Sequence, residues 1–189
     1  MLDQSLKGGF AQPAQDSAHA FRAAMTAMAR PGTIEEIALA EAPEPVSPAA
    51  AALLLVLCDH ETPLYLADGY DTVAVRDWVT FHTGAPLVER AAAQFALGHW
   101  EALLPVTDFA IGTQEYPDRS ATLIVERMEL TSQGGRLTGP GIKDSATLNL
   151  PEQKAFQNNR LLFPLGLDFY FTAGTQLAAL PRTTRVEAD

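Results

Sequence analysis

Residues 47–67, with the sequence SPAAAALLLVLCDHETPLYLA, decide the fold class. Ser47 and Pro48 are typical of a helix start, because a serine hydroxyl caps the first turn and proline fits the first helical position. The apolar run from Ala49 to Cys58 is about half as long as a membrane span, so we expect a buried helix. Residues 63–67 then predict a strand. A buried helix beside a short apolar strand indicates an α/β protein.

The segment before this stretch predicts a helix and a strand. Asp16 or Ser17 can cap the helix, and Arg30-Pro31-Gly32 ends it, because proline disfavours helical geometry at the residue before it. A short strand is predicted at 33–37. The buried face of the helix is predicted from four residues at helical spacing: Phe21, Ala24, Met25 and Met28. Residues 1–12 are expected to form a loose N-terminal segment.

The segment after it predicts further helices and an increasing share of strands. Asp71 or Thr72 can cap a helix that ends at residues 83–86, with an inner face formed by Ala74, Trp78, Phe81 and His82. Strands are predicted at 94–97, 121–128 and 136–138, a helix at about 151–162, and a hairpin from 168–172 and 176–180. We therefore predict a single α/β domain over residues 1–189, with a mixed sheet flanked by helices.

Composition narrows the possible partners and the compartment. The 189 residues carry a formal net charge of −10 and only three lysines, Lys7, Lys143 and Lys154. Nucleic acid is therefore not an expected partner, because phosphate backbones are bound through lysine and arginine. The chain has one cysteine and no basic segment followed by an apolar stretch at its start. We therefore expect a cytoplasmic protein without a secretion signal or a membrane segment.

The sequence contains no established catalytic or metal-binding motif. The four histidines, His19, His60, His82 and His99, are far apart, so no metal site is predicted. The glycine-rich stretch 134–143 fits neither a Walker loop nor a dinucleotide loop, and it predicts a tight turn. Cys58 ends an apolar helix, where a thiol is usually buried and unreactive. The catalytic residues are therefore unknown at this point.

The C-terminal segment 181–187 is the main candidate for binding. It combines forked donors and hydroxyls that suit a carboxylate or a phosphate: Arg182, Thr183, Thr184 and Arg185. The alternative is a solvated strand whose arginines pair with surface carboxylates, as is common in proteins. His82 at a helix end and Asp59 in a turn are further candidates for binding an anion or a partner. For these two residues the alternative is helix capping and turn formation.

Six blocks of the sequence together resemble the PhnH family of carbon–phosphorus lyase subunits. The blocks are FRAAMTAMARPG (21–32), DHETP (59–63), FHTGAP (81–86), RLTGPGI (136–142), FPLGLD (163–168) and PRTTRVE (181–187). Each block is short, but the six occur in the family's order and span residues 21–187. Residues 87–120 carry little of the family's pattern.

The resemblance implies a fold similar to the large domain of transferases that depend on pyridoxal phosphate (PLP), but without PLP. It also implies a homodimer and a core complex with PhnG-, PhnI- and PhnJ-type subunits. That complex joins a phosphonate to the ribose carbon of ATP and displaces adenine, before a radical step on another subunit breaks the carbon–phosphorus bond. ATP is then the expected substrate of the complex, and this subunit is not expected to be catalytic alone. No PLP is expected, because PLP enzymes use a lysine Schiff base and the chain has only three lysines.

Two functional hypotheses remain open from the sequence. In the first, the chain is a scaffolding or site-completing subunit of the phosphonate complex. In the second, it is a stand-alone transferase or binding protein that holds an anionic small molecule through Arg182 and Arg185. Partners retained on purification from the native host, or a genomic neighbourhood of phosphonate genes, would separate the two hypotheses.

Overall fold

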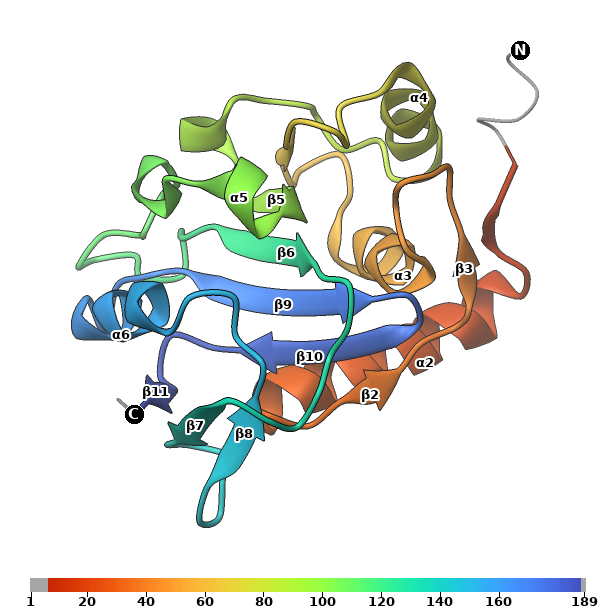
Figure 1. Ribbon diagram of the computed structural model, residues 1–189. Coiled ribbons are helices and arrows are strands. Elements are labelled where there is room, and N and C mark those ends of the chain that lie inside the picture. The colour runs from red at the N-terminus through yellow and green to blue at the C-terminus, as the bar shows by residue number, and fades with distance from the viewer. Residues whose placement is uncertain (1–6, 188–189) are drawn as a thin grey trace.

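A six-stranded sheet runs through the centre of the protein in the order β2-β10-β9-β6-β5-β4 (Figure 1). The structure, a computed structural model, describes residues 7–187. The strands of this sheet are β2 (Glu35–Glu36), β4 (Leu64–Leu66), β5 (Phe95–His99), β6 (Thr122–Glu126), β9 (Asp168–Ala173) and β10 (Gln176–Leu180). Strands β4, β5, β6 and β9 are parallel, while β10 is antiparallel to both β9 and β2. The predicted mixed sheet and the predicted β9–β10 hairpin are confirmed.

Three helices cover one face of the sheet: α2 (Pro13–Ala29), α3 (Pro48–Leu57) and α4 (Val73–His82). Helix α3 begins as predicted, since the Ser47 hydroxyl accepts a hydrogen bond from the Ala50 N–H at 3.2 Å. Thr72 caps α4 in the same way through the Val75 N–H. Helix α3 is buried against α2 and the sheet. Among residues 7–187, no helix is both long enough and apolar enough to span a membrane.

The other face carries shorter elements. Helices α5 (Trp100–Leu103) and α6 (Gln153–Leu161) lie there, with a three-stranded sheet in the order β11-β7-β8. The strands of this small sheet are β7 (Gly135–Thr138), β8 (Ala146–Leu148) and β11 (Arg185–Val186). The chain that leaves β6 crosses in front of β9 and β10 to reach β7 (Figure 1). Aromatic rings from α5, α6 and β9 pack between these elements and the central sheet: Trp100, Phe156, Phe169 and Phe171.

The N-terminal prediction is wrong for the part of the segment that the structure describes. Strand β1 (Gly9–Phe10) pairs antiparallel with β3 (Ala40–Glu41), and α2 begins at Pro13. The side chain of Asp16, predicted as a possible cap, accepts a hydrogen bond from the Gln12 N–H at 2.7 Å. Residues 1–6 of the predicted loose segment lie outside the described residues.

The predicted buried face of α2 is also wrong in part. Ala20, Ala24 and Ala27 are buried, whereas Phe21 and Met25 are 47% and 57% exposed. The buried face is set by the helix that α2 packs against. This is the alanine-rich helix α3, whose small residues permit a close approach of the two helices.

Two aromatic clusters, Trp78 with Phe81 and Phe169–Phe171, could support the homodimer that the family resemblance implies if they were exposed, but they are mostly internal. Trp78, Phe169 and Phe171 are buried in the core, as is Tyr170. In these clusters only Phe81 is exposed. The clusters therefore give no support to the prediction of a homodimer.

The region that lacks the family pattern contributes a central strand and a firmly held loop. Strand β5, predicted only as far as Leu97, extends to His99. Arg90, in a 3₁₀ turn over Arg90–Ala92, donates hydrogen bonds to the carbonyl oxygens of Ala102 and Leu104 at 2.8 and 2.7 Å. The end of α5 is thereby fixed by one arginine.

Candidate functional site

The polar residues of the sheet gather where its parallel strands end. The C-terminal ends of β4, β5, β6 and β9 lie at one edge, which is the usual place for ligand sites in open α/β sheets. His99 of β5 is the direct neighbour of Glu126 in β6, which in turn neighbours Thr172 in β9. Two residues earlier in their strands, Leu97 and Ile124 lie in the core under α2–α4, so His99 and Glu126 face the same side.

Glu126 is a buried carboxyl without an arginine or lysine partner within residues 7–187. Its side chain is held by two neutral donors, the Ser47 N–H at 2.8 Å and the Thr172 hydroxyl at 2.9 Å. Burial raises the pKa of Glu126, against the opposing effects of these hydrogen bonds and of nearby His99. Glu126 therefore joins the start of α3 to β6 and β9, and it releases its proton less readily than an exposed glutamate. Perturbed acids of this kind cluster at functional sites, although structural ones also occur.

His99 and Tyr70 form a hydrogen-bonded pair beside Glu126. The Nδ1 atom of His99 lies 3.1 Å from the backbone oxygen of Glu126, which can only accept, so Nδ1 carries a proton. In the neutral ring, Nε2 then accepts from the Tyr70 hydroxyl at 3.2 Å. Burial, and next the negative charge of Glu126, raise the pKa of Tyr70, so its phenol stays protonated. The exposed imidazole is therefore fixed in one tautomer and one orientation.

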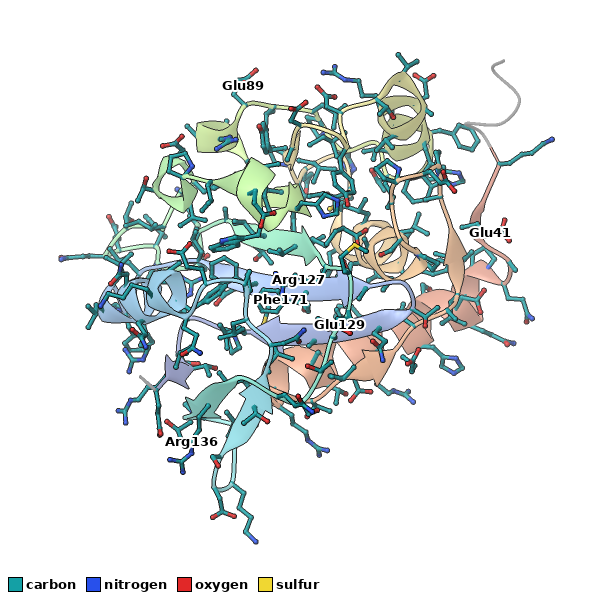
Figure 2. All side chains as sticks on the ribbon, in the orientation of Figure 1. Glu41, Glu89, Arg127, Glu129, Arg136 and Phe171 are labelled. Atoms are coloured by element: carbon teal, nitrogen blue, oxygen red, sulfur yellow. The ribbon has the colours of Figure 1, made fainter. Side chains whose placement is uncertain are left out.

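A concavity of about 270 Å³ opens in front of these residues. It is lined by His99, Trp100, Glu101, Glu126, Arg127, Met128, Glu129 and Asn149. Arg127 and Glu129 lie on the segment that leaves β6 (Figure 2). The Met128 side chain is 96% exposed at the rim.

The site offers acid–base groups but no activated nucleophile. Cys58 is buried at the end of α3, and burial followed by the charge of Asp59 raises the pKa of its thiol to about 12. Thiolate chemistry at neutral pH is therefore not expected there. Within residues 7–187, no cluster of three His, Cys, Asp or Glu side chains is arranged to hold a metal ion.

Arg182, the first of the predicted anion-binding residues, is engaged inside the protein. Its guanidinium forms an ion pair with Asp168, with Nη2 and Oδ2 2.5 Å apart. It also donates to the Pro117 carbonyl at 2.8 Å and to the Ser120 hydroxyl. The Arg182 N–H donates to the same Asp168 carboxylate. These bonds attach the loop before β6 to the start of β9 and the end of β10.

The other residues of the segment have different environments. Thr183 is half-buried, while Thr184 is buried and its hydroxyl has no hydrogen-bond partner within residues 7–187. Arg185 is exposed in β11 and lines a second concavity together with Arg160 of α6. The structure therefore places Arg185 beside Arg160, whereas Arg182 is directed toward Asp168.

Asp59 and His82 lie near the opposite edge of the sheet. Asp59 forms a turn, in which its carboxylate accepts from the Glu61 N–H at 2.8 Å and its own N–H donates to the Thr62 hydroxyl. The His82 ring packs against Trp78 and Phe81 at centroid distances of 4.9 Å. Neither residue is brought to the site at the C-terminal edge.

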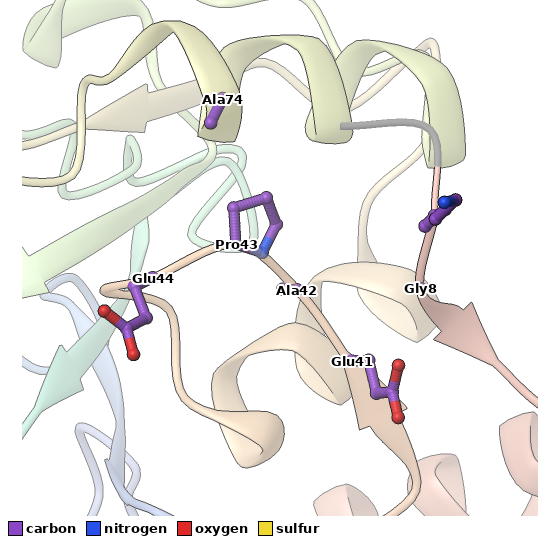
Figure 3. Close-up of a pocket in the computed structure, with 7 residues that line it drawn as sticks. Gly8, Glu41, Ala42, Pro43, Glu44 and Ala74 are labelled. Atoms are coloured by element: carbon purple, nitrogen blue, oxygen red, sulfur yellow. The ribbon is translucent and has the colours of Figure 1, made fainter. Parts of the chain in front are cut away.

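A larger concavity, about 570 Å³, lies between β3 and the start of α4 (Figure 3). Its acidic side chains, Glu41 and Glu44, point to opposite sides of Pro43, and Ala74 faces it from α4 (Figure 3). Within the described part of the chain these two carboxylates do not converge on one point, so we assign no site to this hollow.

Comparison with known proteins identifies the family. The model of the family described as "Bacterial phosphonate metabolism protein (PhnH)" matches residues 8–187. The chain belongs to the PhnH family. A protein of Rhizobium meliloti (strain 1021), named alpha-D-ribose 1-methylphosphonate 5-triphosphate synthase subunit PhnH, is 39% identical over 196 aligned residues, covering 98% of each chain. The putative C-P lyase subunit protein HtxG of Stutzerimonas stutzeri is 33% identical over 177 residues, covering 88% of this chain and 84% of its own.

The PhnH-type sequence blocks meet one another in pairs. The Pro-Gly exit of α2 packs on the turn before β8, where a side chain at Gly141 would lie 1.9 Å from the Ala29 carbonyl oxygen. The turn 59–63 lies beside 83–86, and the Leu64 N–H donates to the Pro86 carbonyl at 2.8 Å. Asp168 and Arg182 join the last two blocks. These blocks therefore hold the fold of the PhnH family together, and none of them contains the site at the sheet edge.

The residues that the sequence left unassigned are Tyr70, His99 and Glu126. The sequence did contain one indication of Glu126. This residue directly follows the apolar residues Leu123–Val125, and a carboxylate is unusual in such a strand. The pairing of Tyr70 with His99 carried no such signal, since it depends on which strands are neighbours.

Proposed function

We propose that this PhnH-family chain is a subunit of the carbon–phosphorus lyase system. With its partner subunits, it acts in the transfer of the ribose triphosphate group of ATP to a phosphonate, with displacement of adenine. The observation that carries the proposal is the match over 98% of both chains to a relative named as a subunit of a ribose 1-methylphosphonate 5-triphosphate synthase.

The charge of the site supports a subunit that needs partners. A triphosphate requires several cationic groups, but the concavity at the sheet edge is lined by Glu101, Glu126 and Glu129, and among residues 7–187 its lining includes one arginine, Arg127, and no lysine. The chain can supply the imidazole of His99, which Tyr70 holds in one tautomer, while the cations that a triphosphate needs come from other subunits.

The proposed assembly follows the family. PhnG-, PhnI- and PhnJ-type subunits are the proposed partners of a homodimer of this chain in the cytoplasm, and light scattering on the purified complex would report its copy number. We further propose that the sheet is related to the large domain of PLP-dependent transferases but binds no PLP. An absorbance band between roughly 330 and 430 nm after incubation with PLP, abolished by borohydride and mapped to one lysine of the chain, would contradict the second part.

Reconstitution of the synthase step tests the proposed function. Partner subunits from the same host, ATP and methylphosphonate are incubated with and without this chain, and released adenine is quantified by chromatography. We expect adenine release only when the chain is present. Full release without it would contradict the proposal, and release by the chain alone would identify a stand-alone transferase.

A further inference from the structure

The end of helix α6 carries an exposed apolar surface. Three consecutive residues, Leu161, Leu162 and Phe163, are 83%, 43% and 49% exposed. An exposed cluster of this kind is unusual for a surface that faces only water, and in soluble proteins it marks a place of protein contact. We call these residues, with the adjoining concavity, the α6 surface.

The concavity beside them, about 530 Å³, contains two arginines. It lies between α6 and β11 and is lined by Gln157, Arg160, Leu161, Arg185, Val186 and Glu187. The Arg160 guanidinium lies 5.0 Å from the centre of the Phe163 ring, and its Nε atom is buried without a hydrogen-bond partner among residues 7–187. No ion pair or side-chain hydrogen bond is formed by Arg185 within the same residues.

The local charge is opposite to that of the whole chain. The protein has a net charge of −10, yet the α6 surface presents two guanidinium groups. The one carboxylate that lines it among residues 7–187, Glu187, is already paired with Arg136 at 2.8 Å. Hydrogen bonds between a guanidinium group and a carboxylate are charge-assisted and stronger than neutral ones, so a carboxylate is the favoured acceptor for these two groups.

These charges also indicate which kind of chain binds there. In a two-fold contact centred on this surface, Arg160 and Arg185 would lie close to the same arginines of the second copy. Like charges in such a contact oppose association. A different protein that carries carboxylates next to apolar side chains fits this surface better than such a contact with a second copy.

We propose that the α6 surface is the docking site for a partner subunit, which inserts an acidic, apolar segment into the concavity between α6 and β11. Carboxylates of that segment pair with Arg160 and Arg185, and its apolar side chains cover Leu161 and Phe163. The inference rests on the proposed function, in which the chain works inside a complex of several subunits.

Charge reversal tests the docking site. Arg160→Glu/Arg185→Glu, Arg185→Glu alone and Leu161→Asp are compared with the wild type for affinity to the remaining subunits, measured by biolayer interferometry. We expect the double variant and Leu161→Asp to bind about 30-fold more weakly or worse, the loss typical of contact hot spots. Melting temperatures should stay unchanged for Leu161→Asp and Arg185→Glu, because both residues are exposed.

Matched controls lie outside the α6 surface. Arg119→Glu makes the same change of charge at an exposed arginine over Tyr116, and Val73→Asp places an acid at an apolar residue that is 76% exposed. Both should bind like the wild type. Normal binding by all three α6-surface variants would overturn this inference alone. If the wild-type chain did not join the complex at all, the proposed function and the inference would both be wrong.

Photo-crosslinking identifies the occupant. With Leu161→p-benzoylphenylalanine in the assembled complex, we expect a crosslink to another subunit, mapped by mass spectrometry to a segment with Asp or Glu. A crosslink to a second copy of this chain, or to a basic segment, would contradict the proposal.

Discussion

Two arginines of one short segment have opposite roles in this protein. The Arg182 side chain is only 13% exposed, and its N–H groups donate hydrogen bonds to Asp168, Pro117 and Ser120. Three residues later, Arg185 is exposed and faces the concavity beside Arg160. The first arginine holds the fold together, and the second is available to another molecule.

The difference arises from a turn in the backbone. The Thr184 N–H donates to the Pro181 carbonyl at 2.9 Å, so the chain bends between the two arginines before it joins β7 as strand β11. Both residues are arginines, and they are only three positions apart in the sequence. Only the surroundings decide whether a guanidinium completes an internal network or remains free for a partner.

The largest predicted effect belongs to the internal arginine. Arg182→Ala should lower the free energy of unfolding by about 3 kcal/mol, because it leaves the Asp168 carboxylate without its counter-ion and frees the loop at residues 117–120. Denaturant titration followed by circular dichroism measures the loss. A loss below about 0.5 kcal/mol, the range of ordinary surface changes, would remove the contrast with Arg185.

Much of the fold could be predicted because its signals are local. The cap at Ser47, the apolar length of α3 and the β9–β10 turn all depend on neighbouring residues, and the structure shows each of them. Which face of α2 is buried depends instead on the element that the helix packs against. The positions of Phe21 and Met25 predict that one face of α2 is buried, but a different face packs against the alanines of α3.

The site could be predicted much less well, because its residues are brought together by tertiary contacts and not by local signals. Tyr70 and His99 are 29 residues apart, and they meet only because β4 and β5 are neighbouring parallel strands. Arg160 has no distinguishing sequence context, and its position beside Arg185 follows from how α6 packs on β11. Segments with many candidate groups, such as 181–187, showed what chemistry was available but not which groups faced outward.

The buried acid Glu126 extends the comparison with the pair of Arg182 and Asp168. Its carboxyl group is held by neutral donors and not by an arginine. Its folded-state pKa lies above the ordinary value of 4.5, so the native protein binds this proton more tightly than the unfolded chain. The resulting stability is fully present below about pH 4.5 and is lost as pH rises through the folded-state pKa. Glu126→Gln removes this dependence, so its stability relative to the wild type should increase with pH across that window.

A pH series of melting temperatures for both proteins measures the difference, in which the titrating groups that do not interact with Glu126 cancel. Glu126→Ala is the control for the hydrogen bonds, since it leaves the Ser47 N–H and the buried Thr172 hydroxyl unpaired. It should cost about 2 kcal/mol with a similarly altered pH dependence. A relative stability of Glu126→Gln that falls as pH rises would show that the carboxylate form is the one favoured by folding.

The smallest expected effect on stability is that of the exposed arginine. Arg185→Ala should change the free energy of unfolding by less than about 0.5 kcal/mol, because the side chain forms no ion pair within residues 7–187 and its loss leaves no buried group unpaired. The same denaturant titration used for Arg182→Ala provides the measurement, and the wild type and Arg119→Ala are the references. Strand β11 should keep its pairing with β7, since this depends on backbone groups at Arg185 and Val186. A loss comparable to that of Arg182→Ala would mean that both arginines serve the fold, and the segment would then have no group to offer a partner.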